Sequence, residues 1–198
     1  NERLSRGDTF VKQVGGAELN VAVGAALLGL HTGVISKLPA HDIGSFMKGK
    51  IRSFGVSDDF FMYDQSPAAR VGIYYYENGA YPRKPKVIYD RNHSSFFSLD
   101  IDEIPEEVYT ASKCFHTTGI TLALNEDIRE TTIEMIKRFK AAGTLVSFDV
   151  NFRGNLWTGD QARECILRIL PYVDIFFCSE DTARLTFLKT GTAREMMK

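Results

Sequence analysis

Hydrophobic residues follow two alternating spacings along this chain, and the alternation predicts its fold class. Short apolar runs typical of buried strands lie at residues 33–38, 113–118, 145–150 and 173–178. Apolar residues at helical spacing lie between or beside them, at residues 15–29, 42–54, 126–142, 160–170 and 180–188. Regular alternation of strands with helices predicts an α/β fold with a mostly parallel sheet and helices on both faces.

The middle of the chain breaks this alternation and predicts a small β lid. Residues 70–77 and 86–91 have the composition of tyrosine-rich strands, and the turn signal Asn78-Gly79 lies between them. Residues 10–16 also look extended, so we expect lid strands around 10–16, 70–77 and 86–91. These strands are expected to cover a ligand, to join two subunits of a homo-oligomer, or to do both.

Composition narrows the class of protein. The 198 residues are 44% hydrophobic and 25% charged, which suits one domain or a large part of one. The formal net charge of -1 gives no reason to expect nucleic acid or an anionic membrane as partner. Residues 19–36 carry no charge, but their polar residues and glycines favour a buried helix, a turn and a strand over a membrane span. The first residues lack a secretory signal, so we expect a cytoplasmic location.

The cysteines and histidines predict no metal site. Cys114, Cys165 and Cys178 are widely spaced and odd in number, which argues against a disulfide framework or a zinc site. We expect them to be buried free thiols in a reducing compartment. His31, His41 and His93 lack the spacing of metal ligands.

A pair of glycines between an extended segment and a helix is the first candidate binding motif. In Gly15-Gly16-Ala17-Glu18-Leu19-Asn20 the glycines let the backbone approach a ligand, and the N–H groups that start the helix can donate to it. Asn20 can bond a hydroxyl as donor or as acceptor. The alternative is a tight turn with a structural asparagine. Neither a dinucleotide fingerprint nor a P-loop motif occurs in the chain.

Further candidates lie where strands end. Ligands of parallel sheets bind at the carboxyl ends of strands, which selects Gly119-Ile120, residues 151–153 and Ser179. Asp149, Asn151 and Arg153 alternate onto one side, and the planar guanidinium of Arg153 suits a carboxylate or a phosphate. The alternative is a structural salt bridge between Asp149 and Arg153.

The predicted lid carries its own polar candidates. Tyr89 and Arg91 share one face of a strand, and Tyr74 shares a face with Tyr76. The alternatives are a solvated edge strand for the first pair and plain β-propensity for the tyrosines.

These motifs together resemble the PfkB carbohydrate kinases, which have the ribokinase-like fold. The segment 15–22, followed by Leu28-Gly29, resembles the N-terminal signature of that family, and residues 34–38 and 42–44 are similar to its next strand and helix start. The 2-keto-3-deoxygluconate kinase subgroup is similar in further segments, in order, at residues 71–74, 87–91, 116–120, 147–153 and 156–157.

The resemblance implies a role for each matching residue. Residues that would line the sugar are Gly16, Ala17, Glu18, Leu19 and Asn20. Residues that would close over it from the lid are Tyr74, Tyr89 and Arg91. Ile120 would offer a backbone contact, and Arg153 would bind the acidic end of the sugar and assist catalysis at the transferred phosphoryl group. Asn151, Arg153 and Ser179 would lie toward ATP, which the family uses with Mg2+.

The resemblance also implies a reaction and two departures. The expected reaction is phosphorylation of 2-keto-3-deoxygluconate at its 6-hydroxyl by ATP, and the alternatives are a fructokinase-type kinase or a non-catalytic sugar-binding module. Ser179-Glu180-Asp181-Thr182 stands where many relatives carry N-x-x-E. The G-A-G-D motif with the catalytic aspartate is not among the 198 residues. We therefore expect the chain to be the N-terminal, sugar-binding part of a kinase domain, with the nucleotide-binding part beyond residue 198 and the chain alone inactive.

Overall fold

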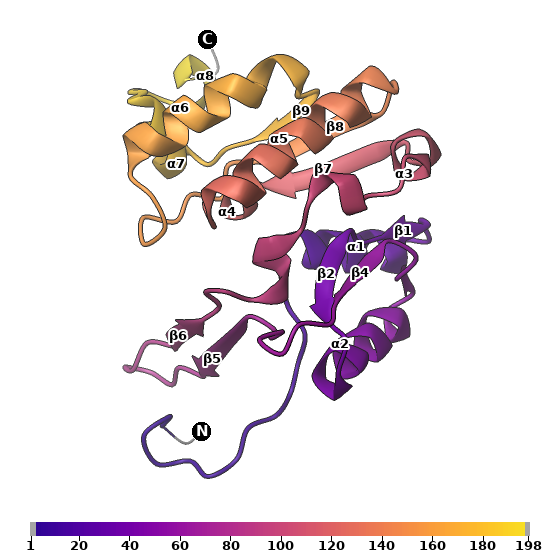
Figure 1. Cartoon of the computed structure of the whole chain (residues 1–198). Coiled ribbons are helices and arrows are strands. Elements are labelled where there is room, and N and C mark those ends of the chain that lie inside the picture. The colour runs from indigo at the N-terminus through magenta and orange to yellow at the C-terminus, as the bar shows by residue number, and fades with distance from the viewer. Residues whose placement is uncertain (1–2, 197–198) are drawn as a thin grey trace. The chain divides into compact units, whose positions relative to one another are not determined.

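The computed structural model describes residues 3–196 and divides the chain into two compact units. The first unit ends at Leu99 and the second begins at Asp100. Each unit combines strands with helices (Figure 1).

The first unit contains two pairs of parallel strands and one antiparallel hairpin. Its elements are α1 (Ala17–Leu27), β1 (Thr32–Gly33), β2 (Ser36–Pro39), α2 (Asp42–Ser53), β3 (Val56–Ser57), β4 (Phe61–Asp64), β5 (Ile73–Glu77), β6 (Lys86–Asp90) and the 3-10 helix η1 (Ser95–Ser98). Strand β1 pairs with β3 and β2 pairs with β4, both in parallel, whereas β5 and β6 are antiparallel. The hairpin β5–β6 projects from the rest of this unit (Figure 1).

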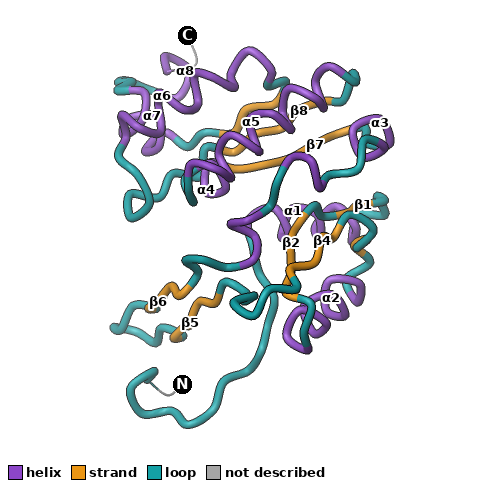
Figure 2. The backbone as a smooth tube through the Cα atoms, viewed as in Figure 1, coloured by secondary structure: helices purple, strands orange, loops and turns teal. Residues whose placement is uncertain are grey.

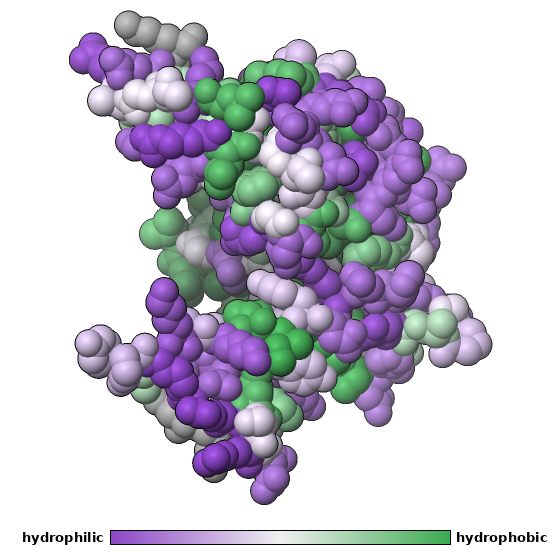
Figure 3. Space-filling view, turned by 90° about the vertical axis from the view of Figure 1, so that its left-hand side faces the viewer, coloured by the Kyte–Doolittle hydropathy of each residue, from purple (hydrophilic) through white to green (hydrophobic). Residues whose placement is uncertain are grey.

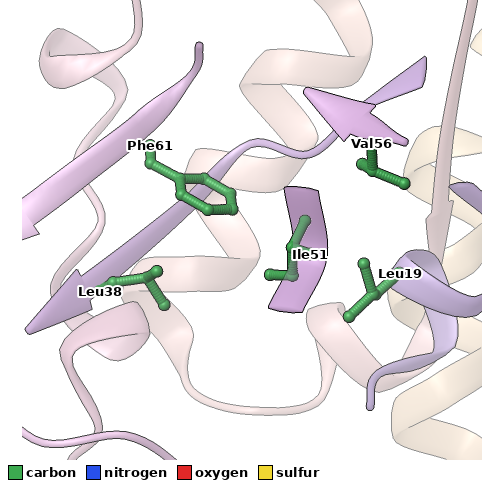
Figure 4. Packing of buried hydrophobic residues seen from close by; sticks show 5 residues of the cluster. All are labelled: Leu19, Leu38, Ile51, Val56 and Phe61. Atoms are coloured by element: carbon green, nitrogen blue, oxygen red, sulfur yellow. The ribbon is translucent and has the colours of Figure 1, made fainter. Parts of the chain in front are cut away.

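One hydrophobic cluster holds the first unit together. Side chains from two helices and three strands meet in it: Leu19, Leu38, Ile51, Val56 and Phe61 (Figure 4). Each is at most 8% exposed. Leu19 lies on the turn of α1 that directly follows the two glycines, so its burial attaches this turn to the core.

The strand expected at residues 33–38 is split in two. Its first part pairs with β3 and its second part with β4. Between these partner strands, Asp59 turns the chain: its backbone N–H donates to Ser57 Oγ at 3.1 Å, and Ser57 Oγ donates to Asp59 Oδ2 at 2.6 Å. A turn in the partner interrupts the ladder, and the interruption divides the strand.

Residues 10–16 form no strand, and the expectation of a lid strand there was wrong. The segment is a loop that leads into α1 (Figure 2). Phe10 and Val11 are 61% and 85% exposed, and no strand pairs with them. The Phe10 ring packs edge-on against Tyr75 with centroids 5.4 Å apart, so the segment contacts the hairpin through a side chain rather than a ladder.

The second unit is built on a three-stranded parallel sheet in the order β7-β8-β9. Its elements are η2 (Ile101–Glu103), α3 (Glu107–Ala111), β7 (Cys114–Thr118), α4 (Gly119–Leu122), α5 (Glu126–Ala141), β8 (Leu145–Asp149), α6 (Gly159–Ile169), η3 (Leu170–Tyr172), β9 (Ile175–Phe177), α7 (Glu180–Phe187) and α8 (Ala193–Met196). The long helix α5 packs along β8 (Figure 1).

Local sequence signals set the ends of these helices. Asn125 Oδ1 accepts from the backbone N–H of Ile128 at 2.8 Å and caps α5, while Gly143, at a φ of 84°, follows its end. Thr158 and Gln161 form a reciprocal capping box at the start of α6. The apolar stripe of α5 then places Ile136 and Phe139 in the core, where each is at most 1% exposed.

Not all cysteines are buried as the sequence predicted. Cys165, on α6, is buried, but Cys178 is half-buried and Cys114 is exposed. Cys114 opens β7, which is an edge strand of its sheet.

Much of the molecular surface in Figure 3 is polar, but hydrophobic side chains reach it in several places. Within residues 3–196, the longest helices fall short of the length and apolar character that a membrane crossing needs.

Candidate functional site

The two glycines predicted to approach a ligand lie at the start of α1. Gly16 is the residue before the helix and adopts a φ of 156°, and its carbonyl accepts from the N–H of Asn20 at 2.9 Å. Gly15 lies directly beside the lid: a Cβ atom at this position would collide with the hydroxyl of Tyr74. Glycine at residue 15 therefore lets the turn and the lid tyrosine touch. Gly15 was not among the residues predicted to line the ligand, although it belongs to the glycine pair that indicated a binding site.

The lid tyrosines face each other across the hairpin. Tyr74 of β5 and Tyr89 of β6 are direct partners in the ladder, with ring centroids 6.2 Å apart. About half of each side chain is exposed, at 49% and 48%. The pair thus offers two hydroxyls and two ring faces near the glycine turn.

The side chain of Arg91 places a positive charge next to this aromatic pair. Its guanidinium carbon lies 4.5 Å from the centroid of the Tyr89 ring, within the range of a cation–π contact. Gly72 makes room for it, because a Cβ atom there would lie 3.1 Å from Arg91 Cβ. The first unit therefore brings together the glycine turn, Tyr74, Tyr89 and Arg91.

The first turns of α1 carry the other residues predicted to line a sugar. Asn20 is exposed, and Ala17 and Glu18 are half-buried. Leu19 differs from them, since its side chain lies in the hydrophobic core. Any ligand contact from Leu19 would have to come from its backbone.

The second unit gathers its candidates at one edge of the sheet. Thr118, Asp149 and Phe177, which end their strands, are aligned across β7, β8 and β9. The residues that follow these strand ends are Ile120, Asn151, Arg153 and Ser179. The rule that ligands bind at the carboxyl ends of parallel strands selected these positions, and they share that edge.

Hydrogen bonds shape the loops at this edge. Thr118 Oγ1 accepts from the N–H of Ile120 at 3.2 Å, and Ser179 Oγ accepts from the N–H of Thr182 at 3.2 Å and caps α7. Asn151 sits at a φ of 38°, a left-handed conformation that asparagine tolerates better than most residues. Its N–H donates to Asp149 Oδ1 at 3.0 Å.

Arg153 is exposed and forms no salt bridge with Asp149. Among the ion pairs of residues 3–196, none joins these two side chains, because the Asp149 carboxylate accepts from Asn151 and the Arg153 guanidinium donates to the carbonyl of Phe152 at 3.0 Å. The structural alternative for this motif is therefore wrong. The guanidinium lies at the surface, where an anion can reach it.

The described residues offer no ready metal site. Within residues 3–196, no three histidine, cysteine, aspartate or glutamate side chains cluster closely enough to hold a metal ion.

The fold and these motifs define a class of protein, that of the carbohydrate kinases. The family model described as pfkB family carbohydrate kinase matches residues 1–198, and the chain belongs to this family. The resemblance in the sequence is thereby confirmed, and so is the ribokinase-like α/β fold class.

Three similar proteins illustrate the relationship. The chain is 35% identical over 192 residues to the 2-dehydro-3-deoxygalactonokinase of Haloferax volcanii, covering 97% of this chain and 59% of that protein. It superposes on the crystal structure of 2-dehydro-3-deoxygluconokinase from Thermotoga maritima with a TM-score of 0.90 and 32% identity, covering 96% of this chain and 57% of that one. For a fructokinase from Xylella fastidiosa with bound ATP, the TM-score is 0.75 and the identity 25%, over 87% of this chain and 52% of that one. The chain thus spans little more than half the length of these relatives.

Proposed function

We propose that the natural protein is an ATP-dependent kinase that phosphorylates 2-keto-3-deoxygluconate at its 6-hydroxyl. The observation that carries this proposal is the guanidinium of Arg91, which stacks on Tyr89, whose partner Tyr74 touches Gly15 in the glycine turn of α1. A guanidinium binds a carboxylate through charge-assisted hydrogen bonds, and a neutral sugar has no group that uses them equally well. The names of the relatives from Haloferax volcanii and Thermotoga maritima support the same substrate class.

In this proposal the first unit binds the sugar. The turn at Gly16 and the first turn of α1, with Ala17, Glu18 and the backbone of Leu19, line one side, and Asn20 bonds a hydroxyl. Tyr74, Tyr89 and Arg91 close from the lid. Aromatic faces suit the C–H faces of a sugar, while the tyrosine hydroxyls suit its oxygens.

The second unit serves the phosphoryl group. Phosphoryl transfer depends on positioning and on stabilising charge more than on covalent chemistry. Arg153 neutralises charge on the transferring group and assists at the acidic end of the sugar, while Asn151 and Ser179 lie on the nucleotide side. Ile120 contributes its carbonyl or its half-buried side chain, since its N–H already donates to Thr118. In this proposal Mg2+ enters with the nucleotide, as part of the substrate MgATP.

Exposed side chains on the lid support a homo-oligomer. Tyr76 and Val87 are cross-strand partners on the same face as Tyr74, and they are 52% and 38% exposed. We propose that part of this face pairs with a second copy of the protein. A cytoplasmic location fits the free thiols, which persist in a reducing compartment.

Replacing Arg91 tests the proposal directly. In the natural protein, Arg91→Met should lower kcat/KM for 2-keto-3-deoxygluconate by about tenfold to a hundredfold, because one charged hydrogen-bonding contact is worth roughly 1.5–3 kcal/mol. The value for fructose should change little. Arg52→Met, on α2, is the control, since Arg52 is exposed and faces Asp58 instead. Equal losses for both sugars would remove the assignment of Arg91 to a substrate carboxylate.

A fructokinase-type activity is the second candidate. The resemblance to the fructokinase from Xylella fastidiosa favours it. It predicts the opposite substrate preference, with fructose used better than the acidic keto-sugar.

A further inference from the structure

Arg70 lies just before the lid and contacts the chain on both sides of Arg91. Its Nη2 is 2.8 Å from Asp90 Oδ2 and donates to the Asp90 carbonyl at 3.2 Å. Its Nη1 donates to the carbonyl of Asn92 at 3.1 Å. A single guanidinium therefore holds the carbonyls of the residues that immediately precede and follow Arg91.

Arg91 lies one residue beyond the lid ladder. Strand β6 ends at Asp90, the partner of Ile73. Ladder hydrogen bonds fix a backbone only as far as the strand extends. The two carbonyls bound by Arg70 flank Arg91, one at the last residue of β6 and one beyond the strand.

The backbone of Arg70 is anchored in turn to a strand of the core. Its N–H donates to Ser95 Oγ at 3.2 Å, and its carbonyl accepts from the N–H of Ser95 at 2.8 Å. Ser95 is 3% exposed and donates to Asp64 Oδ2 at 2.8 Å, and Asp64 is the last residue of β4. Asp64, Ser95, Arg70 and Asp90 therefore form a continuous hydrogen-bonded clasp from β4 to the end of the lid.

The geometry of the clasp matters more than its charge. Arg70 and Asp90 are 36% and 51% exposed, and an exposed ion pair contributes little to stability. The planar guanidinium, however, presents several donors in a fixed arrangement that a lysine cannot reproduce. It can therefore fix the orientation of the segment at residues 90–92 without making a large contribution to folding.

We propose that Arg70 is a positioning residue that sets Arg91 and Tyr89 for recognition of the acidic end of the substrate. This inference rests on the proposed function, in which Arg91 binds the substrate carboxylate. Loss of the clasp leaves the chemistry and the nucleotide contacts in place and weakens only sugar binding. It therefore raises KM for the acidic sugar and leaves kcat and KM for ATP nearly unchanged.

The experiment compares Arg70→Met with Arg168→Met in the natural protein. Arg168 is a matched control, because it is similarly exposed, forms a two-pronged ion pair with Glu130 at 2.7 and 2.6 Å, and lies on α6, which carries no candidate residue. Steady-state kinetics give KM for 2-keto-3-deoxygluconate and for ATP. Hydrogen exchange of the sugar-free protein gives the protection of residues 88–94.

Arg70→Met should raise KM for the acidic sugar on the order of tenfold and speed exchange in residues 88–94, whereas Arg168→Met should do neither. Arg70→Lys keeps the positive charge but lacks the planar guanidinium. Its KM for the acidic sugar should therefore lie between those of the wild type and Arg70→Met. Asp90→Asn keeps both carbonyl bonds, so it should raise KM less than Arg70→Met. If Arg70→Met unfolds at a much lower temperature than the wild type, the KM values of Arg70→Lys and Asp90→Asn can still be compared with that of the wild type.

Faster exchange with an unchanged KM would overturn the inference, because the clasp would then be structural only. Unchanged exchange would overturn it as well, since Arg70 would not hold the segment. If the wild-type protein does not phosphorylate the acidic sugar, the proposed function fails. The exchange of residues 88–94 would still decide whether the clasp exists.

Discussion

Two arginines carry the proposed substrate preference, one in each unit. Arg91 stacks on Tyr89, and its flanking carbonyls are bound by Arg70. Arg153 is exposed at the carboxyl edge of the parallel sheet and is not neutralised by Asp149. Both side chains lie outside the hydrophobic core, so each arginine can be replaced without leaving a cavity there.

Arg153→Ala should lower kcat and not merely raise KM. An interaction made only in the transition state lowers kcat when it is lost, whereas uniform binding affects KM alone. The expected loss is about 2–4 kcal/mol, as for one donor to a developing anion. Steady-state kinetics of the natural protein measure it, with Arg163→Ala as a control from the exposed face of α6. An unchanged kcat in a folded variant would deny Arg153 a role in phosphoryl transfer.

Asp64 gives the clasp a pH dependence. Its carboxylate accepts from the backbone N–H and the hydroxyl of Ser66 and from the hydroxyl of Ser95, which hold its pKa below the ordinary value of 3.8. Because the folded-state pKa is the lower one, Asp64 contributes stability above pH 3.8, and this contribution disappears as the pH falls through the folded-state pKa.

Urea denaturation at several pH values tests this expectation. The wild-type protein should be more stable than Asp64→Asn at pH 7, and the difference should shrink below pH 3.8. Asp160→Asn, at an exposed position on α6, serves as control. A difference that stays constant down to pH 2.5, roughly one unit below an ordinary aspartate, would show that Asp64 does not act through its charge.

Residue-level features were predictable where they follow from alternation along one strand. The contact of Arg91 with Tyr89 is of this kind. Asn151 and Arg153 are not, because β8 ends at Asp149 and Asn151 has a φ of 38°, so the predicted alternation of Asp149, Asn151 and Arg153 onto one side is broken there. Their place at the end of a strand follows instead from the rule for parallel sheets. The contact of Gly15 with Tyr74 and the clasp at Arg70 join segments distant in sequence, and no local periodicity encodes them. The burial of Leu19 was hidden because a helix that is apolar on all sides does not reveal which side faces the core.

At the scale of elements, close approaches of the backbone fix how strands meet helices. Gly119 begins α4 at the end of β7, and a Cβ atom there would collide with the carbonyl of Val150 and lie 3.4 Å from Trp157. Glycine at this position lets two neighbouring strand ends come together at the candidate edge.

Gly119→Ala should therefore destabilise the protein by about 1–3 kcal/mol, because the backbone must shift to admit a methyl group. Gly24→Ala is a matched control in the interior of α1, where a Cβ atom would meet no atom within 4 Å. Alanine has a higher helix propensity, so this control should be stabilising by roughly 0.5–1 kcal/mol. Denaturant unfolding measures both. A neutral Gly119→Ala would contradict the close packing of the β7 and β8 ends.

Element types were predictable, and element boundaries less so. The helix expected at residues 126–142 is α5, Glu126–Ala141, because its cap, apolar stripe and terminal glycine agree. Two strand predictions were wrong, those for residues 33–38 and 10–16. Both failed for the same reason, because a strand forms only where a partner is available to pair with it. The partner of the first is interrupted by a turn, and the second has none among the described strands.

At the scale of the whole molecule, membership of the pfkB family unites both sets of candidate residues in one expected activity. The family follows from separate motifs in the correct order, which is why the sequence alone identified it. The substrate does not follow in the same way. Kinases for keto-deoxy sugars and for fructose share the fold, and their substrates differ by a carboxylate that only a few side chains would contact.

The most direct test of the central claim is the substrate preference of the natural protein. With MgATP and purified sugars, kcat/KM should be at least about tenfold higher for 2-keto-3-deoxygluconate than for fructose, because charged hydrogen bonds to the carboxylate add roughly 1.5–3 kcal/mol. A preference for fructose would contradict the assignment of Arg91 and Arg153 to an acidic sugar and leave the fold intact. Failure to phosphorylate either sugar would contradict the proposed kinase activity itself.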